Sequence, residues 1–183
     1  MTGWKDKRRI MQRYDLTAKM YDERYAEEQQ KKYKKTLEKV NVTGKIVLDV
    51  GCGSGLLFPE VASKAKFVLG LDISRQLLLL AKEQAKDLGD VFVVQADADN
   101  LPFADGFFDC VFAFTILQNM PKPSKTLSEL KLVTKGKGNV AITALKKAFG
   151  LEEFMDLIEA SGLQIAAFVD EENINCYIAV LGA

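Results

Sequence analysis

A glycine-rich turn follows the first run of apolar residues that is long enough to form a buried strand. Gly51, Gly53 and Gly55 stand at every second position directly after residues 46–50. Such a turn lets the backbone pass close to a ligand, because a Cβ atom at Gly51 or Gly53 would occupy the space that the ligand needs. A tight structural turn has the same composition, so this feature alone is weak evidence for a binding site.

Two carboxylates stand where the next two strands are expected to end. Asp72 follows the run 66–71, and an acidic side chain at this place can accept hydrogen bonds from both hydroxyl groups of a ribose. Asp97 follows the run 91–96. Because ligands of open α/β sheets bind outside the carboxyl ends of the strands, the turn and the two aspartates predict one crevice for a nucleoside. NAD would suit the turn and Asp72 equally well.

The segment 95–103, Gln-Ala-Asp-Ala-Asp-Asn-Leu-Pro-Phe, resembles the adenine-reading loop of class I, Rossmann-like S-adenosylmethionine-dependent methyltransferases. Residues 105–111 are similar to the fourth motif of the same family. The spacing G-x-G-x-G in residues 51–55 also differs from the dinucleotide form G-x-G-x-x-G, whose third glycine seats a helix under a pyrophosphate. S-adenosylmethionine has no phosphate, so the spacing favours methyl transfer over hydride transfer. The chain is therefore identified as a member of this family, with a domain similar to methyltransferase types 11 and 25.

The resemblance implies S-adenosylmethionine as the cofactor and a role for each matched residue. Asp97 is expected to accept a hydrogen bond from the adenine amino group, and the backbone amide of Ala98 to address the ring. Asp72 is expected at the ribose. Asp49 and the carbonyl group of Phe114 are expected at the ammonium group of the methionine part. The other residues expected beside the cofactor are Gly51, Cys52, Gly53, Gly55, Ile73 and Tyr21.

The sequence names no catalytic residue. It contains no histidine, which removes the commonest general base near neutral pH and the commonest metal ligand. The cysteines Cys52, Cys110 and Cys176 lack a C-x-x-C spacing, so we expect neither a metal site nor a disulfide framework. Because the methyl donor is already activated, the main requirement is an acceptor held in line with the sulfur–methyl bond.

The acceptor is expected over residues 115–121, after the fourth strand. Family members that methylate exocyclic or amide nitrogens have an Asn/Asp-Pro-Pro-aromatic tetrad near this point, whereas residues 113–116 are Ala-Phe-Thr-Ile. The resemblance therefore disfavours adenine-N6 and glutamine-amide methylation. The amides of Gln118 and Asn119 can donate to and accept from a substrate, as amides do in nucleobase readout. The alternative is that they cap a helix before Pro121.

Several functions remain open at this stage. Residues 1–45 hold 13 lysines and arginines against 7 aspartates and glutamates, an excess that favours an RNA or ribosome-associated acceptor or, alternatively, a solvated helix of mixed charge. A small-molecule acceptor is the other enzyme hypothesis, with a helix bearing Tyr14, Tyr21 and Tyr25 as a lid; packing alone would explain these tyrosines equally well. The third hypothesis is a cofactor-binding subunit without catalysis.

A protein partner is expected at residues 91–94. Residues 48–57 and 101–118 loosely resemble the eukaryotic small-subunit ribosomal RNA guanine-N7 methyltransferase. The relatives of that enzyme are activated by a small zinc-containing partner that pairs with the edge strand. The run Val-Phe-Val-Val at 91–94 would be an aggregation hazard if left bare, although a loop or the N-terminal helix could also cover it.

The elements that position these residues alternate in type along the chain. A Gly- and Pro-free helical stripe runs from Asp15 to Val40 and ends at Gly44, and after it short β-branched runs alternate with helical segments, which is typical of βαβ units. Strands are expected at 45–50, 66–71, 91–96, 109–114, 138–144, 164–169 and 176–181, and helices from about 56, at 74–89, 124–136 and 151–162. The fold class is α/β: one doubly wound, mostly parallel seven-stranded sheet, for which the resemblance implies the order 3-2-1-4-5-7-6 with strand 7 antiparallel.

Length and composition indicate one domain. The 183 residues suit a single core, in which 1–44 form a helical extension and 45–183 the Rossmann-like part. The longest apolar runs, such as 77–81, are too short to span a bilayer, and no secretory signal opens the chain. We therefore expect a cytoplasmic protein without membrane contact.

Overall fold

The computed structural model describes residues 3–17 and 21–183, and the side chains of 3–16 and 26–183. The helices are α1 (Gly3–Thr17), α2 (Tyr21–Leu37), α3 (Phe58–Val61), α4 (Arg75–Ala85), α5 (Pro123–Val133) and α6 (Leu151–Ser161), with a short 3-10 helix η2 (Leu117–Asn119). The strands are β1 (Ile46–Val50), β2 (Phe67–Asp72), β3 (Val91–Gln95), β4 (Phe108–Ala113), β5 (Thr134–Leu145), β6 (Gln164–Val169) and β7 (Cys176–Gly182).

The described strands form one sheet in the order β3-β2-β1-β4-β5-β7-β6. The pairs from β3 to β5 are parallel, and β7 is antiparallel to both of its neighbours. The sequence-based expectation of a seven-stranded α/β sheet in this order is confirmed.

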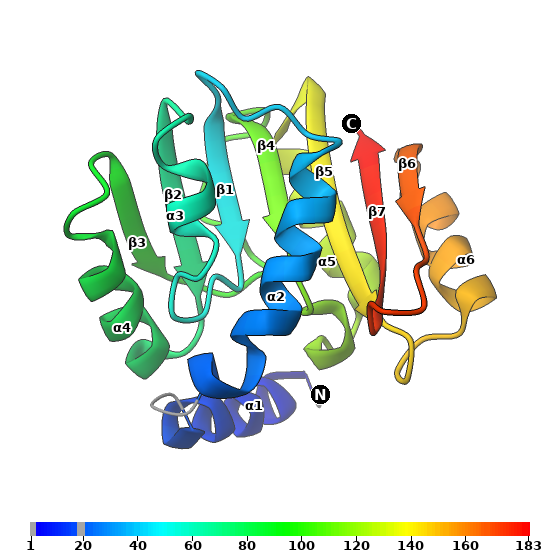
Figure 1. Ribbon diagram of the computed structural model, residues 1–183. Helices are drawn as coiled ribbons and strands as arrows, with labels where there is room; N and C mark the ends of the chain where they lie inside the picture. The colour runs from blue at the N-terminus through cyan, green and yellow to red at the C-terminus, as the bar shows by residue number, and fades with distance from the viewer. Residues whose placement is uncertain (1–2, 18–20) are drawn as a thin grey trace.

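Helices cover both faces of the sheet, because successive strand residues point to opposite sides. On one face Leu48 and Val111 pack with residues of α5 and α6, and on the other Val47 and Phe112 pack with residues of α2, α3 and α4. Figure 1 shows α2 and α3 in front of the sheet and α5 behind it. The central strands are therefore buried on both sides, which explains their nearly continuous apolar sequences.

Helix α1 lies along the edge of the sheet at which the parallel strands end (Figure 1). The sequence predicts one N-terminal helix from Asp15 to Val40, whereas the structure has two helices, and α1 begins at Gly3. The stripe of tyrosines did not reveal this division, and no glycine or proline marks it.

The other element boundaries agree to within a few residues, apart from two. Helix α4 begins after the expected N-cap Ser74, whose hydroxyl accepts a hydrogen bond from the Leu77 amide, but it ends at Ala85 rather than at Gly89. Strand β5 begins at Thr134 instead of residue 138, because its first residues continue directly from α5 and the pairing register with β4 then shifts. Neither difference moves a residue of the crevice.

Candidate active site

The glycine turn after β1 requires glycine for two reasons. Gly51, Gly53 and Gly55 have φ values of +74°, +58° and +89°, in the left-handed region that other residues rarely adopt. A Cβ atom on Gly51 would also lie 2.3 Å from Cγ2 of Ile116. The amides of Gly51 and Cys52 both donate to the carbonyl oxygen of Leu71, at 2.7 and 3.0 Å, which fixes the turn against the end of β2.

Asp72, the last residue of β2, holds this turn from the side. Its carboxylate accepts hydrogen bonds from the amides of Gly53, at 3.0 Å, and Ser74, at 2.8 Å. Burial raises the pKa of Asp72, although the hydrogen bonds from Ser74 and Gly53 oppose the shift. Each carboxylate oxygen can accept more than one hydrogen bond, so Asp72 retains the capacity to accept from a ligand.

Asp97 lies across the crevice and forms an ion pair that the sequence did not reveal. The Lys7 ammonium of α1 donates to both oxygens of Asp97, at 2.6 and 2.8 Å, and lies 2.5 Å from Asp99. Partial burial acts to raise the pKa of Asp97, but the Lys7 bond and the Asp99 amide outweigh it, and the pKa is lowered. Lys7 is only 7% exposed, so this pair is largely shielded from solvent.

Asp49 lies behind the glycine turn and is also buried. Burial and then the neighbouring Asp72 carboxylate raise the pKa of Asp49 to about 8. A second buried carboxylate so close to Asp72 is costly when both are charged, and a cation nearby would relieve that cost. The arrangement suits a positively charged ligand.

Thr115 follows β4 in a strained conformation. Its φ is +60°, the one positive value among the described residues other than glycine. Its amide donates to Thr143 Oγ1 at 2.8 Å, its hydroxyl accepts from the Lys32 ammonium at 3.0 Å, and its carbonyl oxygen accepts from the side-chain amides of Gln118 and Asn119. Such strain costs about 1–3 kcal/mol and persists where surrounding contacts fix it, commonly at functional sites.

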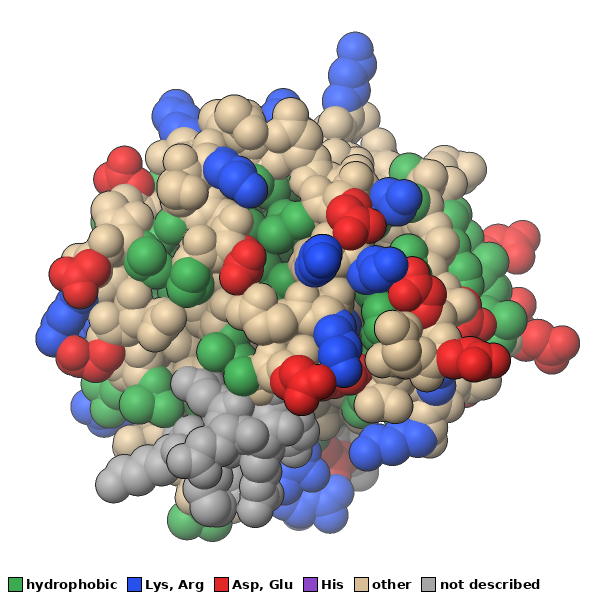
Figure 2. All heavy atoms as spheres, viewed as in Figure 1, with side chains coloured by type: hydrophobic (Ala, Val, Ile, Leu, Met, Phe, Trp, Pro, Cys, Tyr) green, Lys and Arg blue, Asp and Glu red, His purple; other side chains and the backbone are tan. Residues whose placement is uncertain are grey.

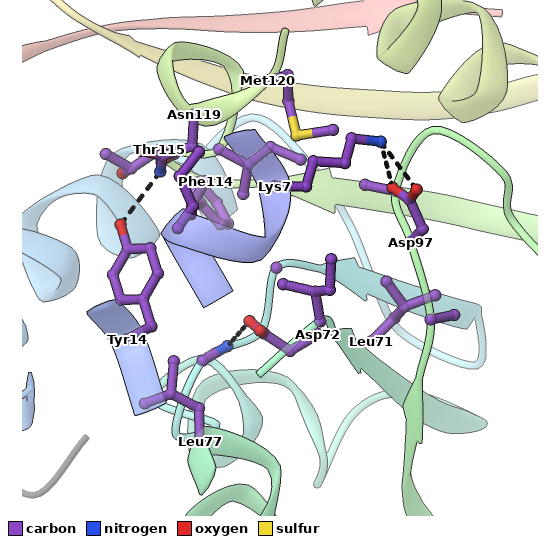
Figure 3. A pocket seen from close by; sticks show the side chains of 17 residues that line it. Lys7, Tyr14, Leu71, Asp72, Leu77, Asp97, Phe114, Thr115, Asn119 and Met120 are labelled. Carbon is purple, nitrogen blue, oxygen red and sulfur yellow. Dashed lines mark hydrogen bonds and ion pairs between the residues drawn. The ribbon is translucent and has the colours of Figure 1, made fainter. Parts of the chain in front are cut away.

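These strand ends enclose a pocket of about 90 Å³ beneath α1. Figure 3 shows Lys7 directed at Asp97 on one side, and Tyr14 directed at Asn119 on the other. The Asn119 amide donates to the Tyr14 hydroxyl at 3.1 Å. At its other end α1 is tied to α4, because Asp15 accepts hydrogen bonds from Ser74 Oγ at 2.6 Å and the Gln76 amide at 3.2 Å. Helix α1 is thus fastened on both sides of the pocket.

The structure brings most of the expected cofactor residues together. The pocket lining includes Gly51, Gly53, Asp72, Ile73, Asp97, Ala98 and Phe114, as well as the expected substrate residue Asn119. Asp49, Cys52 and Gly55 lie outside this lining, and Gln118 lines a neighbouring cavity. The side chain of Tyr21 lies outside the described residues.

Sequence reasoning missed the contribution of α1. Lys7, Ile10 and Tyr14 line the pocket, and their spacing of three and four residues is that of one helical face. This pattern was available in the sequence, but Tyr14 was assigned to a different helix. The side-chain amides of Gln118 and Asn119 donate to the Thr115 carbonyl oxygen. Both side chains thus bind the local backbone, which is the kind of contact expected in the alternative of a helix cap.

Comparison with known proteins identifies the family. The family model described as a methyltransferase domain matches residues 48–142, which is more than half of the 183 residues. The chain belongs to this family. Residues 48–142 therefore form a methyltransferase domain, as the resemblance of the segment 95–103 indicated.

Curated relatives of this methyltransferase act on different acceptors. Phosphatidylethanolamine N-methyltransferase of Cereibacter sphaeroides is 32% identical over 126 residues, covering 67% of this chain and 62% of that protein. Demethylmenaquinone methyltransferase of Staphylococcus saprophyticus is 35% identical over 111 residues, covering 58% of this chain and 48% of that protein. The chain spans about half the length of such relatives, so the likeness includes the cofactor motifs but not the whole enzymes.

Solved structures share the fold over more of the chain. A methyltransferase from Aquifex aeolicus superposes with a TM-score of 0.73 at 23% identity, covering 81% of this chain and 88% of that one. A chain in the complex of the Haloferax volcanii Trm112 methyltransferase activator with a methyltransferase superposes with a TM-score of 0.80 at 19% identity. The match covers 93% of this chain and 95% of that one.

None of the helices in 3–17 and 21–183 has the length and apolar character needed to cross a membrane. Within the same residues, no three acidic, cysteine or histidine side chains are grouped as metal ligands would be.

Proposed function

We propose that this methyltransferase transfers the methyl group to a small acceptor molecule, and that α1 is the lid of its active site. The observation that supports this proposal is the pair of polar attachments, Lys7 to Asp97 and Asp15 to Ser74, that hold α1 over the pocket. Lids of this kind exclude water and enclose substrates. The N-terminal extension, residues 1–44, then belongs to the same structural domain as the sheet.

In this proposal S-adenosylmethionine occupies the crevice between the glycine turn and residues 96–98. Asp72 accepts from the ribose hydroxyls, and Asp97 accepts from the adenine amino group. Asp49, behind the turn, balances the positive charge of the methionine part. The bound cofactor supplies an activated methyl group, so the chain has only to align the acceptor, which is worth about 7–11 kcal/mol in well-oriented reactions.

Cofactor binding requires α1 to shift. The pocket of about 90 Å³ is smaller than the roughly 300–1,000 Å³ of typical ligand sites. The Lys7 ammonium also donates to both oxygens of Asp97, so its side chain competes for space with an adenine amino group bound at the same carboxylate. We propose that Lys7 leaves Asp97 when the cofactor enters and keeps its ion pair with Asp99, whose other oxygen is bound to Thr126.

An RNA acceptor is the second candidate, and the outer face of α1 favours it. Lys5, Arg8 and Arg9 are exposed on this helix. Figure 2 shows Lys and Arg side chains along the lower edge of the molecule, whereas side chains of both signs alternate over α2. A phosphate-binding helix would give an affinity for RNA that falls steeply with salt.

A protein partner at the edge strand is a separate proposal. In the described sheet β3 pairs with β2 alone, and Phe92 is 56% exposed. An apolar edge of this kind suits a partner that adds a strand. The activator in the Haloferax complex is one protein to test, with Phe92→Asp as the variant expected to lose binding.

Transfer of a labelled methyl group decides between the acceptors. The protein is incubated with labelled S-adenosylmethionine and with separate metabolite, RNA and protein fractions of a cell extract. We expect label in a small molecule, and the Asp72→Ala variant, as a matched control, to transfer none. Label in RNA or protein would reject the small-molecule proposal and leave the cofactor assignment intact.

A further inference from the structure

A second, larger cavity adjoins the cofactor pocket. It has a volume of about 1030 Å³ and lies among α2, η2, the segment after β5 and the segment before β7. Both cavities are lined by Tyr14, Thr115 and Asn119, so they meet at the strained turn after β4. We name this cavity the acceptor chamber, because a molecule in it reaches the cofactor pocket at these three residues.

The lining residues of the acceptor chamber that the structure describes include both charged and apolar side chains. Its charged residues are four cations and two carboxylates, namely Arg13, Lys32, Lys146, Lys147, Glu28 and Glu172. Its apolar residues, among those that the structure describes, are Leu145, Ala148 and Ile174. Prenylated quinones and phospholipid tails need extended apolar walls, since burial of their surface provides most of their binding energy. The charged side chains of the described lining interrupt such walls, so they favour an acceptor that itself carries a charge.

Lys32 brings a positive charge into the chamber from α2. It is only 2% exposed, and its ammonium donates to the Thr115 hydroxyl at 3.0 Å. Its ion pair with Glu28 is long, at 3.9 Å, and the same Glu28 carboxylate accepts from the amide and the side chain of Asn175. A buried ammonium is costly unless an anion compensates it closely, so an anionic group beside Lys32 would be strongly favoured.

The other two lysines of the chamber are placed differently. Lys146 is already held by Asp170 at 2.7 Å and by the Glu171 carbonyl oxygen at 2.7 Å. Lys147 is exposed, so it attracts anions from solution rather than fixing one. Among the described lysines of the lining, Lys32 is the one beside the turn at which the two cavities meet.

Two amide oxygens in the lining have unused acceptor capacity. Among the described residues, neither Gln29 Oε1 nor Gln118 Oε1 has a hydrogen-bond partner, and both atoms are buried. Gln29 is 6% exposed and lies three residues before Lys32 on α2. A buried acceptor without a donor costs about 1–3 kcal/mol, so a ligand that supplies N–H or O–H groups would recover that energy.

We propose that the acceptor chamber binds a water-soluble acceptor that combines a carboxylate or phosphate group with N–H or O–H donors. The anion lies against Lys32, and the donors bind the amide oxygens of Gln29 and Gln118. This proposal rests on the proposed function, because it names the class of small acceptor for the same site.

Matched pairs of probes test the charge requirement in the full chain. Ligand-observed NMR and titration compare para-hydroxybenzoate with its methyl ester, and phenyl phosphate with phenol; menadione represents the quinones. We expect each anion to bind at least about tenfold more tightly than its neutral partner, as for hydrogen bonds between charged groups. Equal binding within the pairs, tighter binding of menadione, or no binding by either anion would overturn the proposal.

Variants locate the site. We expect Lys32→Met to remove the preference for the anionic probes and Lys32→Arg to retain it. Gln29→Met should weaken the binding of para-hydroxybenzoate, whose hydroxyl group is the donor for Gln29. Lys137→Met, at an exposed position of β5, is the control for loss of one charge. If Lys32→Met does not fold, the Arg and Gln29 variants still decide the question; unchanged binding in Gln29→Met and loss of preference in Lys32→Arg would contradict the assignment. Transfer of label into RNA would instead reject the proposed function, so the two failures are distinguishable.

Discussion

The cofactor pocket and the acceptor chamber of this methyltransferase are built from different parts of the chain. The pocket is formed mainly by backbone turns and carboxylates at the ends of β1, β2, β3 and β4, within the residues 48–142 that match the family model. The chamber is formed largely by α2 and by residues 145–148 and 172–175, outside that match. We therefore infer that residues within the family match mainly bind the methyl donor and that the flanking segments mainly select the acceptor.

The largest expected effect is loss of cofactor binding in Asp72→Ala. Two hydrogen bonds from ribose hydroxyls to a buried carboxylate are worth about 3 kcal/mol or more, so affinity should fall about a hundredfold. Calorimetric titration with S-adenosylmethionine measures this change. Asp105→Ala, in an exposed loop, is the control and should bind like the wild type. An unchanged affinity in Asp72→Ala would remove the ribose assignment.

The second prediction concerns Asp49 and the pH dependence of stability. Its pKa is raised from 3.8 to about 8, so between these values the folded state holds a proton that the unfolded state has lost. The free energy of unfolding therefore falls as pH rises through this window. Asp49→Asn stays neutral and should exceed the wild type by roughly 1–3 kcal/mol at pH 8, with a smaller gain near pH 5.

Thermal unfolding across this pH range measures the difference, and cofactor titration supplies the complementary result. Since the charged form of Asp49 is expected to balance the cofactor's positive charge, Asp49→Asn should bind S-adenosylmethionine more weakly despite its greater stability. A stability difference that does not vary with pH would show that Asp49 is ionised throughout.

A smaller effect is expected for Lys7→Met. The substitution keeps most of the apolar stem of the side chain but frees Asp97, so S-adenosylmethionine should bind about three- to tenfold more tightly, because the competent state is more populated. Amide hydrogen exchange in α1 should become faster, since one of its polar attachments is lost. Weaker cofactor binding in this variant would mean that Lys7 supports the bound cofactor rather than competing with it.

The smallest effect is expected on the outer face of α1. Arg8→Gln combined with Arg9→Gln should change transfer to a small acceptor by less than about twofold, because exposed charges far from the reaction contribute little. A loss of methyl transfer to RNA in this variant that grows as the salt concentration is lowered would instead favour the RNA candidate.

The difference between the cofactor pocket and the acceptor chamber also explains what could be predicted from the sequence. Local rules were sufficient for the glycine turn, for Asp72 and for Asp97, because each follows a strand whose apolar residues are recognisable. The contacts of Lys7 with Asp97 and of Lys32 with Thr115 join residues about 90 and 83 positions apart, and no local pattern specifies such pairs. The chamber was missed for this reason, and so was the division of the N-terminal segment into α1 and α2.

The structure of a complex with S-adenosylmethionine tests the central claim most directly. We predict the ribose on Asp72, the adenine amino group on Asp97 in place of Lys7, and the methyl group directed past Thr115 into the acceptor chamber. A cofactor bound elsewhere, or a methyl group that points away from Thr115 and the chamber, would contradict the account.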